Sequence, residues 1–280
     1  MNIYDIAKLA NVSIATVSRV VNNSPKVSPK TKEKVLTVMK ENEYTPNAFA
    51  RGLGLGSMKT VGIICPNIDD IYMAKAVSYL ERNLHAHGYD CILGCSGFKQ
   101  EEKENYVRLL LSKKIDTLIL VGSTYAGNGK DESDTDYIRE AAEQVSIFMI
   151  NAKVSGDNIY CTYADDFQAT YEVTKAFIRR GKEKILFMYD SESYSARQKM
   201  AGYEAALQDA GYPIRGNLKF KTRNDIEYTR DMLLEYNRTL DFDSVLATED
   251  GIAIGAVKYA KIKGLVIPEE LAVAGYNNSI

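Results

Sequence analysis

The chain has 280 residues, 45% of them hydrophobic and 26% charged, and a formal net charge of −2 at pH 7. This length suffices for a small domain followed by two lobes of roughly 100 residues each. No stretch approaches the roughly 18 consecutive apolar residues of a membrane-spanning helix, and residues 1–3 lead directly into a predicted helix rather than a signal peptide. We therefore expect a cytoplasmic protein without a membrane partner. This expectation disfavours an exported solute-binding protein.

The two histidines and four cysteines lack the spacing of a metal site. His85 and His87 lie at i and i+2, so they do not share a helix face. The cysteines show no zinc-ligand pattern, which predicts reduced thiols in a cytosolic protein. We predict no metal, no cofactor and no catalytic residues.

Positive charge is concentrated near the N-terminus. Residues 1–60 contain nine Lys and Arg against four Asp and Glu, whereas the remaining 220 residues contain 26 against 33. The overall net charge, which is close to zero, does not reveal this asymmetry. A basic N-terminal segment on an acidic body predicts that contact with nucleic acid is confined to the first segment.

Two short amphipathic helices open the chain. Apolar residues recur at the i, i+3, i+4, i+7 spacing of one helix face at Ile3, Ile6, Ala7 and Ala10. A second periodic stretch runs through Thr16, Val17, Val20 and Val21. Asn11-Val12-Ser13 separates the two runs. This arrangement predicts a helix-turn-helix. The alternative is a helical hairpin that only packs against another part of the protein.

The second helix carries side chains suited to DNA. Ser13 can cap its first turn. Ile14 can pack on a thymine methyl group, Ala15 permits close approach, and Arg19 can bind guanine through two hydrogen bonds. The short polar side chains of Thr16, Ser18 and Asn22 suit phosphate oxygens, which position a protein without reading sequence.

A third helix is predicted over 29–44, with Ser28 as its N-cap and Pro29 in its first turn. The following segment, 46–58, is rich in glycine, so a helix from Pro46 to Leu53 is weak and is expected to order only on DNA. Leu53 could then wedge between base steps in the minor groove, with Asn47 and Arg51 on the backbone or groove edge. The alternative for this segment is a flexible linker.

Apolar strands alternate with amphipathic helices through the rest of the chain, which predicts an α/β class with parallel sheets. We place a first lobe at 59–160 and a second at 161–280, with the chain crossing between them near 159–163. Ligands bind beyond the carboxyl ends of strands in such sheets, so two facing lobes predict a cleft between them.

The whole chain resembles the lactose/galactose repressor (LacI/GalR) family. The family's all-α DNA-binding head and hinge are similar to the segments YDIAKLANVSIATVSRVVN, VSPKTKEKV and YTPNAFARGL. Its two-lobed effector core is similar to the segments ADDFQATYEVTKAFIRRGKEKILFM and VIPEELAVAGYNN. That core is in turn similar to periplasmic sugar-binding proteins. The resemblance implies a homodimer on a pseudo-palindromic operator. It implies base reading by Ile14, Ala15 and Arg19, a wedge at Leu53, and backbone contacts from Tyr4, Ser13, Thr16, Ser18, Asn22, Thr31 and Asn47.

The same resemblance implies effector-binding positions at Tyr72, Ser123, Asp165, Lys199, Glu249 and Asn277. Lys199 stands where the family has a sugar-gripping arginine, Glu249 where it has asparagine, and Asn277 where it has aspartate. Lysine is a point charge and lacks the guanidinium fork. Three possibilities remain open for the cleft. It binds a modified or charged saccharide, it binds another metabolite, or it binds no small molecule and a co-regulatory protein controls the chain instead.

These features predict a nucleoid-associated transcriptional regulator, and a repressor in particular. The other classes considered are a solute-binding module and a sugar-modifying α/β enzyme. GLGLGS follows a predicted helix rather than joining a strand to a helix, so it is a poor dinucleotide-binding signal. The chain stops directly after a predicted core strand, where family members continue, so either the sequence is truncated and its first lobe incomplete, or those further elements are absent from this protein.

The hinge hypothesis can be tested by hydrogen exchange on residues 46–54. Because the glycines weaken an isolated helix, amide protection should appear only when operator DNA is bound. Equal protection without DNA would contradict the hypothesis.

Overall fold

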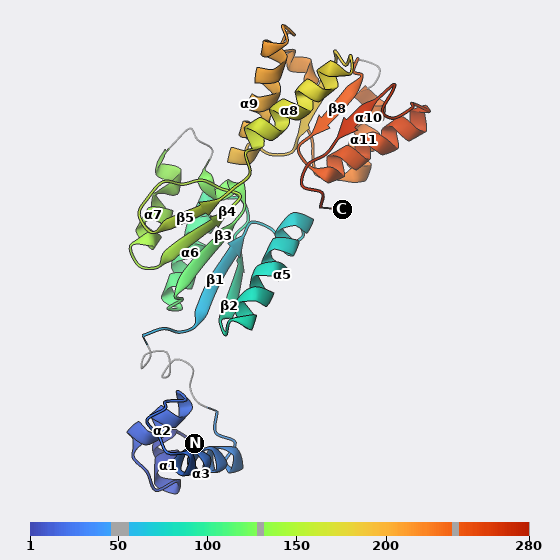
Figure 1. Ribbon diagram of the computed structural model, residues 1–280. Helices are drawn as coiled ribbons and strands as arrows, with labels where there is room; N and C mark the ends of the chain where they lie inside the picture. The colour runs from blue at the N-terminus through green and yellow to red at the C-terminus, as the bar shows by residue number, and fades with distance from the viewer. Residues whose placement is uncertain (46–55, 128–131, 237–240, 280) are drawn as a thin grey trace.

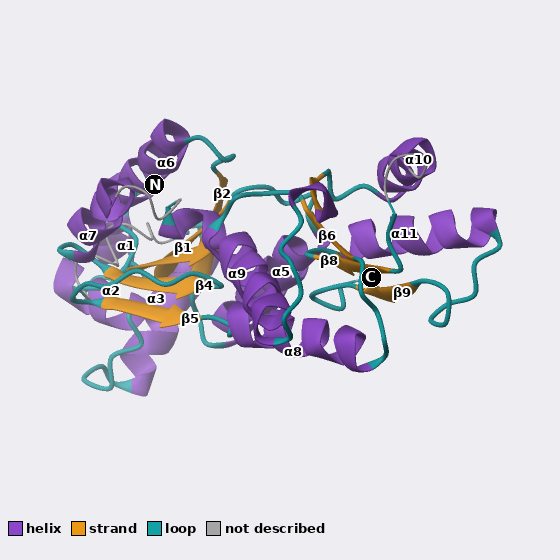
Figure 2. Ribbon diagram, turned by 90° about the horizontal axis from the view of Figure 1, so that it is seen from above, coloured by secondary structure: helices purple, strands orange, loops and turns teal. Residues whose placement is uncertain are grey.

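A computed structural model describes residues 1–45, 56–127, 132–236 and 241–279. The first 45 residues form a cluster of three helices, which we call the head. Two α/β lobes follow, and in Figure 1 the head stands apart from both. Viewed from above, helices flank the strands of each lobe (Figure 2).

The head consists of α1 (Ile3–Leu9), α2 (Ile14–Val21) and α3 (Pro29–Glu41). Serine caps begin the second and third helices as predicted, because the Oγ atoms of Ser13 and Ser28 accept the N–H groups of Thr16 and Thr31 at 3.1 and 3.2 Å. The helices enclose one apolar core, built from Ile6, Ala7, Ala10, Val17, Val20, Val35 and Met39.

Helix α3 ends earlier than the predicted 29–44. The Asn42 side chain donates to the carbonyl of Val38 at 2.8 Å, and Glu43 takes a left-handed conformation with φ of 49°. The Tyr44 N–H then bonds the carbonyl of Met39 at 2.9 Å. A left-handed residue after the last turn closes a helix by satisfying its final carbonyls. The apolar spacing up to Tyr44 therefore predicted packing but not the end of the helix.

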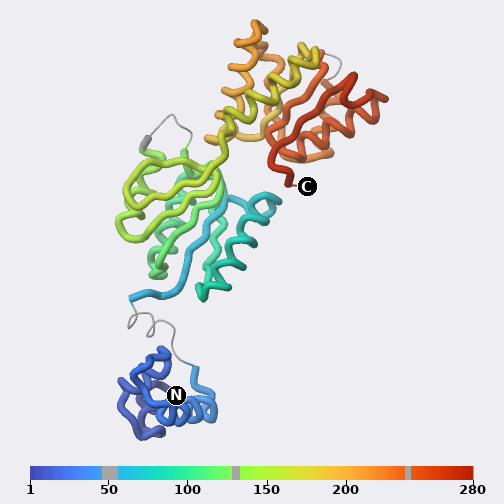
Figure 3. Tube along the Cα trace, viewed as in Figure 1, coloured from blue at the N-terminus to red at the C-terminus, as the bar shows by residue number. Residues whose placement is uncertain are grey.

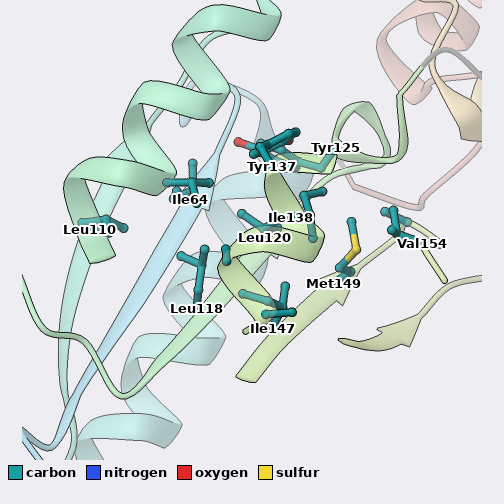
Figure 4. Packing of buried hydrophobic residues seen from close by; sticks show 14 of the residues in the cluster. Ile64, Leu110, Leu118, Leu120, Tyr125, Tyr137, Ile138, Ile147, Met149 and Val154 are labelled. Atoms are coloured by element: carbon teal, nitrogen blue, oxygen red, sulfur yellow. The ribbon is translucent and has the colours of Figure 1, made fainter. Parts of the chain in front are cut away.

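The first lobe contains a parallel five-stranded sheet in the order β2-β1-β3-β4-β5. Its elements are β1 (Thr60–Cys65), α5 (Ile71–Ala86), β2 (Asp90–Cys95), α6 (Gln100–Ser112), β3 (Thr117–Val121), η1 (Ser123–Ala126), η2 (Glu132–Thr135), α7 (Asp136–Ala142), β4 (Ser146–Ile150) and β5 (Ile159–Thr162). Alternate residues of one strand face opposite sides of a sheet. One side packs Ile64, Leu118, Leu120, Ile147 and Met149 against α6 and α7 (Figure 4). The other side packs against α5.

The second lobe contains a parallel four-stranded sheet in the order β7-β6-β8-β9. Its elements are α8 (Asp166–Arg179), β6 (Ile185–Tyr189), α9 (Tyr194–Asp209), η3 (Gly216–Leu218), β7 (Lys219–Lys221), α10 (Ile226–Tyr236), β8 (Ser244–Ala247), α11 (Asp250–Lys263) and β9 (Ala272–Ala274). Helices α10 and α11 cover one face, and α8 and α9 cover the other. Helix α9 begins at Tyr194, where the Ser193 side chain caps its first turn.

The predicted boundary between the lobes, at 160/161, falls inside a strand. Strand β5 pairs in parallel with β4, with Ile147 opposite Ile159 and Ile150 opposite Thr162. The first lobe thus extends to Thr162, and residues 163–165 lead across to α8. The last described residues return to the first lobe (Figure 3). There the Lys75 side chain donates a hydrogen bond to the carbonyl of Ser279 at 2.7 Å.

Gly202 is required where α8 and α9 touch. A Cβ at this position would lie 2.2 Å from the Phe167 carbonyl oxygen, which belongs to the α8 backbone. We expect Gly202→Ala to lower the free energy of unfolding by about 1–3 kcal/mol, because a packed backbone cannot yield without strain. Urea denaturation would measure the loss. Gly216→Ala is the matched control, since nothing lies within 4 Å of its added Cβ. Equal effects of both substitutions would contradict this account.

Candidate DNA-binding surface and ligand cleft

Helix α2 presents one stripe of its surface to solvent. Val17 and Val20 are buried in the head, whereas Ile14, one turn before Val17 at the start of α2, is 42% exposed. Ala15 and Arg19 are also exposed, and Ser18 is half-buried. The residues predicted to read bases therefore lie together on the outer face, as a helix entering the major groove requires.

Among the hydroxyls predicted to contact the DNA backbone, that of Ser13 caps α2, and those of Thr16 and Thr31 lie beside helix-capping serines. Ser13 Oγ lies 2.9 Å from Thr16 Oγ1, and Ser28 Oγ lies 2.8 Å from Thr31 Oγ1. These side chains satisfy N–H groups at helix starts, where further amides can meet phosphate. Their contact with phosphate stays a prediction.

Two other predicted backbone contacts are placed differently in the head. Tyr4 is 66% exposed and open to a phosphate. Asn22 ends α2, and its Oδ1 is buried without a hydrogen-bond partner within the described structure. The predictions for Asn47, Arg51 and Leu53 fall outside the described residues.

A cavity of about 610 Å³ lies between the two lobes. Its walls are the segments that follow the strands: Pro66 and Asn67 after β1, Ser123 and Thr124 after β3, Asn151 after β4, Asp190 and Ser191 after β6, and Thr248 and Glu249 after β8. Parallel strands bring their carboxyl ends to one edge, so residues distant in sequence meet there. The predicted cleft is thus present.

Five of the six predicted effector-binding residues line this cavity, namely Tyr72, Ser123, Lys199, Glu249 and Asn277. Asp165 does not. It is exposed, and its Oδ1 accepts the Gln168 N–H at 2.9 Å as the N-cap of α8. The neighbouring Asp166 is buried and accepts the Tyr276 hydroxyl at 2.6 Å. The helix start turns Asp165 outward, so the structure does not support its place in the set.

Lys199 is buried in the cavity wall, with 4% of the residue exposed. Its Nζ donates to the Thr248 carbonyl at 3.1 Å, lies 4.0 Å from Glu249 Oε1, and sits 3.7 Å from the centre of the Tyr276 ring. Burial lowers the pKa of this ammonium, while Glu249 and the other nearby carboxylates oppose that shift. The ammonium is therefore held inside the protein by a carbonyl, a carboxylate and a ring face.

Glu249 is the carboxylate beside it. Burial raises its pKa from 4.5 to about 7; Lys199 opposes the rise, and Asp190 and Asp70 add to it. Asn277 Nδ2 donates to Glu249 Oε2 at 2.7 Å, which favours the ionised form. A carboxyl group with such a pKa changes charge near neutral pH, so the charge of the cleft depends on pH.

Four residues of this region were missed by the sequence reasoning: Asp70, Asp190, Thr248 and Tyr276. Three of them follow directly on strands or stand at a helix start, which is a recognisable signal in a parallel α/β protein. Tyr276 has no such signal, because only the fold brings its ring over Lys199. Among the described residues, no group of three or more His, Cys, Asp or Glu side chains could hold a metal ion.

Sequence profiles of two protein families match this chain. Residues 2–47 match bacterial regulatory proteins of the lacI family, and residues 58–279 match the periplasmic binding proteins and sugar-binding domain of the LacI family. Across the described ranges, no helix is both long and apolar enough to cross a membrane.

Curated relatives cover the full length of the chain. An HTH-type transcriptional regulator of Lachnoclostridium phytofermentans is 47% identical, over all of this chain and 84% of its own. The catabolite control protein A of Staphylococcus xylosus is 32% identical, over 100% of this chain and 83% of its own. A lac repressor dimer bound to operator and the anti-inducer ONPF superposes with a TM-score of 0.85, at 23% identity, over 99% of this chain and 82% of that chain. That similarity shows a shared fold.

The raised pKa of Glu249 predicts a pH dependence of stability. Between pH 4.5 and 7 the folded state holds a proton that the unfolded state has released, so this residue's contribution to stability falls as pH rises through that window. Glu249→Gln should remove this fall, which is on the order of 3 kcal/mol in full. Urea denaturation at several pH values would measure it.

Glu235→Gln is the control for that experiment, because it makes the same charge change on the exposed face of α10. Its stability should follow the wild-type pH dependence. A Glu249→Gln curve parallel to the wild-type curve would show that the glutamate titrates alike in both states.

Proposed function

We propose that this chain, which belongs to the LacI family of bacterial regulatory proteins and is a DNA-binding transcriptional regulator, is a repressor. A small molecule bound in the interlobe cleft sets its affinity for the operator. The observation that carries the DNA-reading part is the outward stripe of α2. Ile14, Ala15 and Arg19 are exposed together there, and Val17 and Val20 anchor the opposite side in the head core.

Arg19 is the proposed main reader of sequence. Its guanidinium fork can donate two hydrogen bonds to the O6 and N7 atoms of one guanine, the commonest specific contact in the major groove. Ile14 then contacts a thymine methyl group. Tyr4, Ser13, Thr16, Ser18, Asn22 and Thr31 fix the head on the phosphate backbone.

Two copies of the chain bind one operator in this proposal. One small head covers only a half-site, and a symmetric dimer reads two half-sites related by a two-fold axis. The operator is therefore pseudo-palindromic. The lac repressor structure of the same fold is a dimer on its operator.

The ligand would act through the lobes. We assign DNA binding to residues 1–45, the hinge to 46–58, and ligand sensing to the lobes at 59–162 and 163–279. Closure of the cleft would change the spacing of the two hinges in a dimer. Coupling of this kind is typically about 1–3 kcal/mol, or roughly 5- to 150-fold in operator affinity. Tyr72, Ser123, Glu249 and Asn277 would contact the ligand, with Lys199 behind them.

We assign no catalysis to the cleft. One of its carboxylates, that of Glu249, accepts a hydrogen bond from the Asn277 amide, and the neighbouring Asp166 accepts one from the Tyr276 hydroxyl. The relatives are regulators, which favours sensing over turnover. A DNA-binding regulator acts in the bacterial cytoplasm, and association with the nucleoid is part of the proposal.

The Arg19 assignment predicts a specific loss on Arg19→Lys. The substitution keeps the charge and removes the fork, so affinity for the cognate site should fall by about 1–3 kcal/mol. Affinity for unrelated DNA and its salt dependence should stay the same, since both follow the number of phosphate contacts. Fluorescence anisotropy on a duplex enriched by the wild-type protein would measure both.

Lys261→Ala is the matched control, because it removes an exposed positive charge from the end of α11, outside the head. It should leave both affinities unchanged. If Arg19→Lys keeps the wild-type ratio of cognate to unrelated binding, Arg19 does not read a base.

A further inference from the structure

The interlobe cleft contains more negative charge than its own cations neutralise. The charged residues along its walls are Asp70, Asp134, Asp190, Glu192 and Glu249 against Lys103 and Lys199. A like-charge excess in a partly enclosed space is costly, and an opposite charge on a ligand would relieve it.

The acidic residues at the edge of the cleft already have positive neighbours. Glu192 forms an ion pair with Lys221 at 3.0 Å. Asp134 stands beside Lys103, whose Nζ donates to the Thr124 carbonyl at 3.0 Å. The uncompensated charge is therefore concentrated deeper, around Asp70, Asp190 and Glu249.

Lys199 does not balance that inner group. Four carboxylates act on its ammonium, those of Glu249, Asp166, Asp190 and Asp250, and Asp70 acts on Glu249 in turn. Two of these, Asp166 and Asp250, accept hydrogen bonds from Tyr276 and Ser279. Four carboxylates thus act on this one ammonium, and among the described residues only Glu249 lies within ion-pair distance of it, at 4.0 Å. That ammonium is buried against a carbonyl and a ring face, so it is poorly placed to receive an anionic ligand.

Thr248 gives an independent sign that a polar ligand belongs here. It lines the cavity, is only 2% exposed, and its Oγ1 makes no well-formed hydrogen bond within the described structure. The Asp190 carboxylate is its neighbour, and a hydrogen bond of poor geometry between the two side chains opposes the rise of the Asp190 pKa. Buried hydroxyls are normally paired, and an unpaired one costs about 1–3 kcal/mol. A donor on a bound ligand would supply the missing partner.

We propose, on the basis that the cleft is the effector site, that the effector is an amino sugar, a saccharide carrying a free protonated amine that Glu249, Asp190 and Asp70 bind. The uncharged polar residues of the walls suit its hydroxyl groups, namely Asn67, Ser123, Asn151, Ser191 and Ser193. Met73 and Phe98 offer apolar surface to the ring.

Other charge classes fit these walls less well. A phosphorylated saccharide would place two negative charges among carboxylates and would be repelled. A divalent metal ion needs several ligands at once, and the described residues offer no cluster of three His, Cys, Asp or Glu side chains for one. An ammonium group on a polyol satisfies both the charge and the hydrogen-bonding groups.

The test is isothermal titration calorimetry on the full chain with matched sugars. The amines are glucosamine, galactosamine and mannosamine, each compared with its N-acetyl derivative and its parent hexose, and glucose 6-phosphate is the anionic probe. At least one amine should bind with a Kd below about 1 mM and at least about 10-fold more tightly than its N-acetyl derivative, a difference of about 1.4 kcal/mol. Binding by no amine, or equal or tighter binding of a neutral or phosphorylated sugar, would overturn the proposal.

Variants locate the charge preference. Glu249→Gln and Asp190→Asn should each reduce the ratio of amine to N-acetyl affinity by about 10-fold or more, because each removes one negative charge next to the ammonium. Glu235→Gln on α10 should leave the ratio at the wild-type value. An unchanged ratio in both cleft variants would place the amine elsewhere and contradict the proposal.

Operator binding by the same preparations separates this inference from the proposed function. If the protein selects and binds a DNA site but shows no preference for the amine, only the ligand class is wrong. If no preferred DNA site exists, the proposed function fails whatever the sugars do.

Discussion

Burial of apolar side chains in separate cores determines which residues remain for function. The head core fixes α2 by Val17 and Val20, and only the opposite stripe of that helix, with Ile14 and Arg19, is left for a partner. In each lobe the strands are covered by helices on both faces, so the polar segments after the strands are the places where side chains can converge on a ligand. The DNA-binding surface and the cleft both follow from this constraint.

Elements with strong local signals could be predicted from the sequence closely. Helices α2 and α3 begin where Ser13 and Ser28 place a cap. Ends that depend on tertiary contacts were less predictable. The end of α3 depends on a left-handed Glu43 that no local signal required. The limit of the first lobe depends on pairing between β4 and β5, which lie nine residues apart in the chain.

The cleft was predictable as a location, because strand ends meet in parallel sheets, but less so as a set of side chains. Asp165 and Asp166 are adjacent in sequence and have opposite roles, since the first caps α8 in solvent and the second bonds Tyr276 inside. The burial of Lys199 against the Tyr276 ring arises from packing between distant segments. Such burial changes the chemistry of the site, because it engages the lysine with a carbonyl and a ring face and leaves the carboxylates of the cleft in excess.

The most direct test of the central claim is selection of bound duplexes from random DNA by the full chain. The account predicts enrichment of a two-fold-symmetric sequence containing guanine in each half-site, because two heads present the same α2 stripe with Arg19 to equivalent groove edges. Enrichment of no sequence above background, or of a sequence without two-fold symmetry, would contradict it.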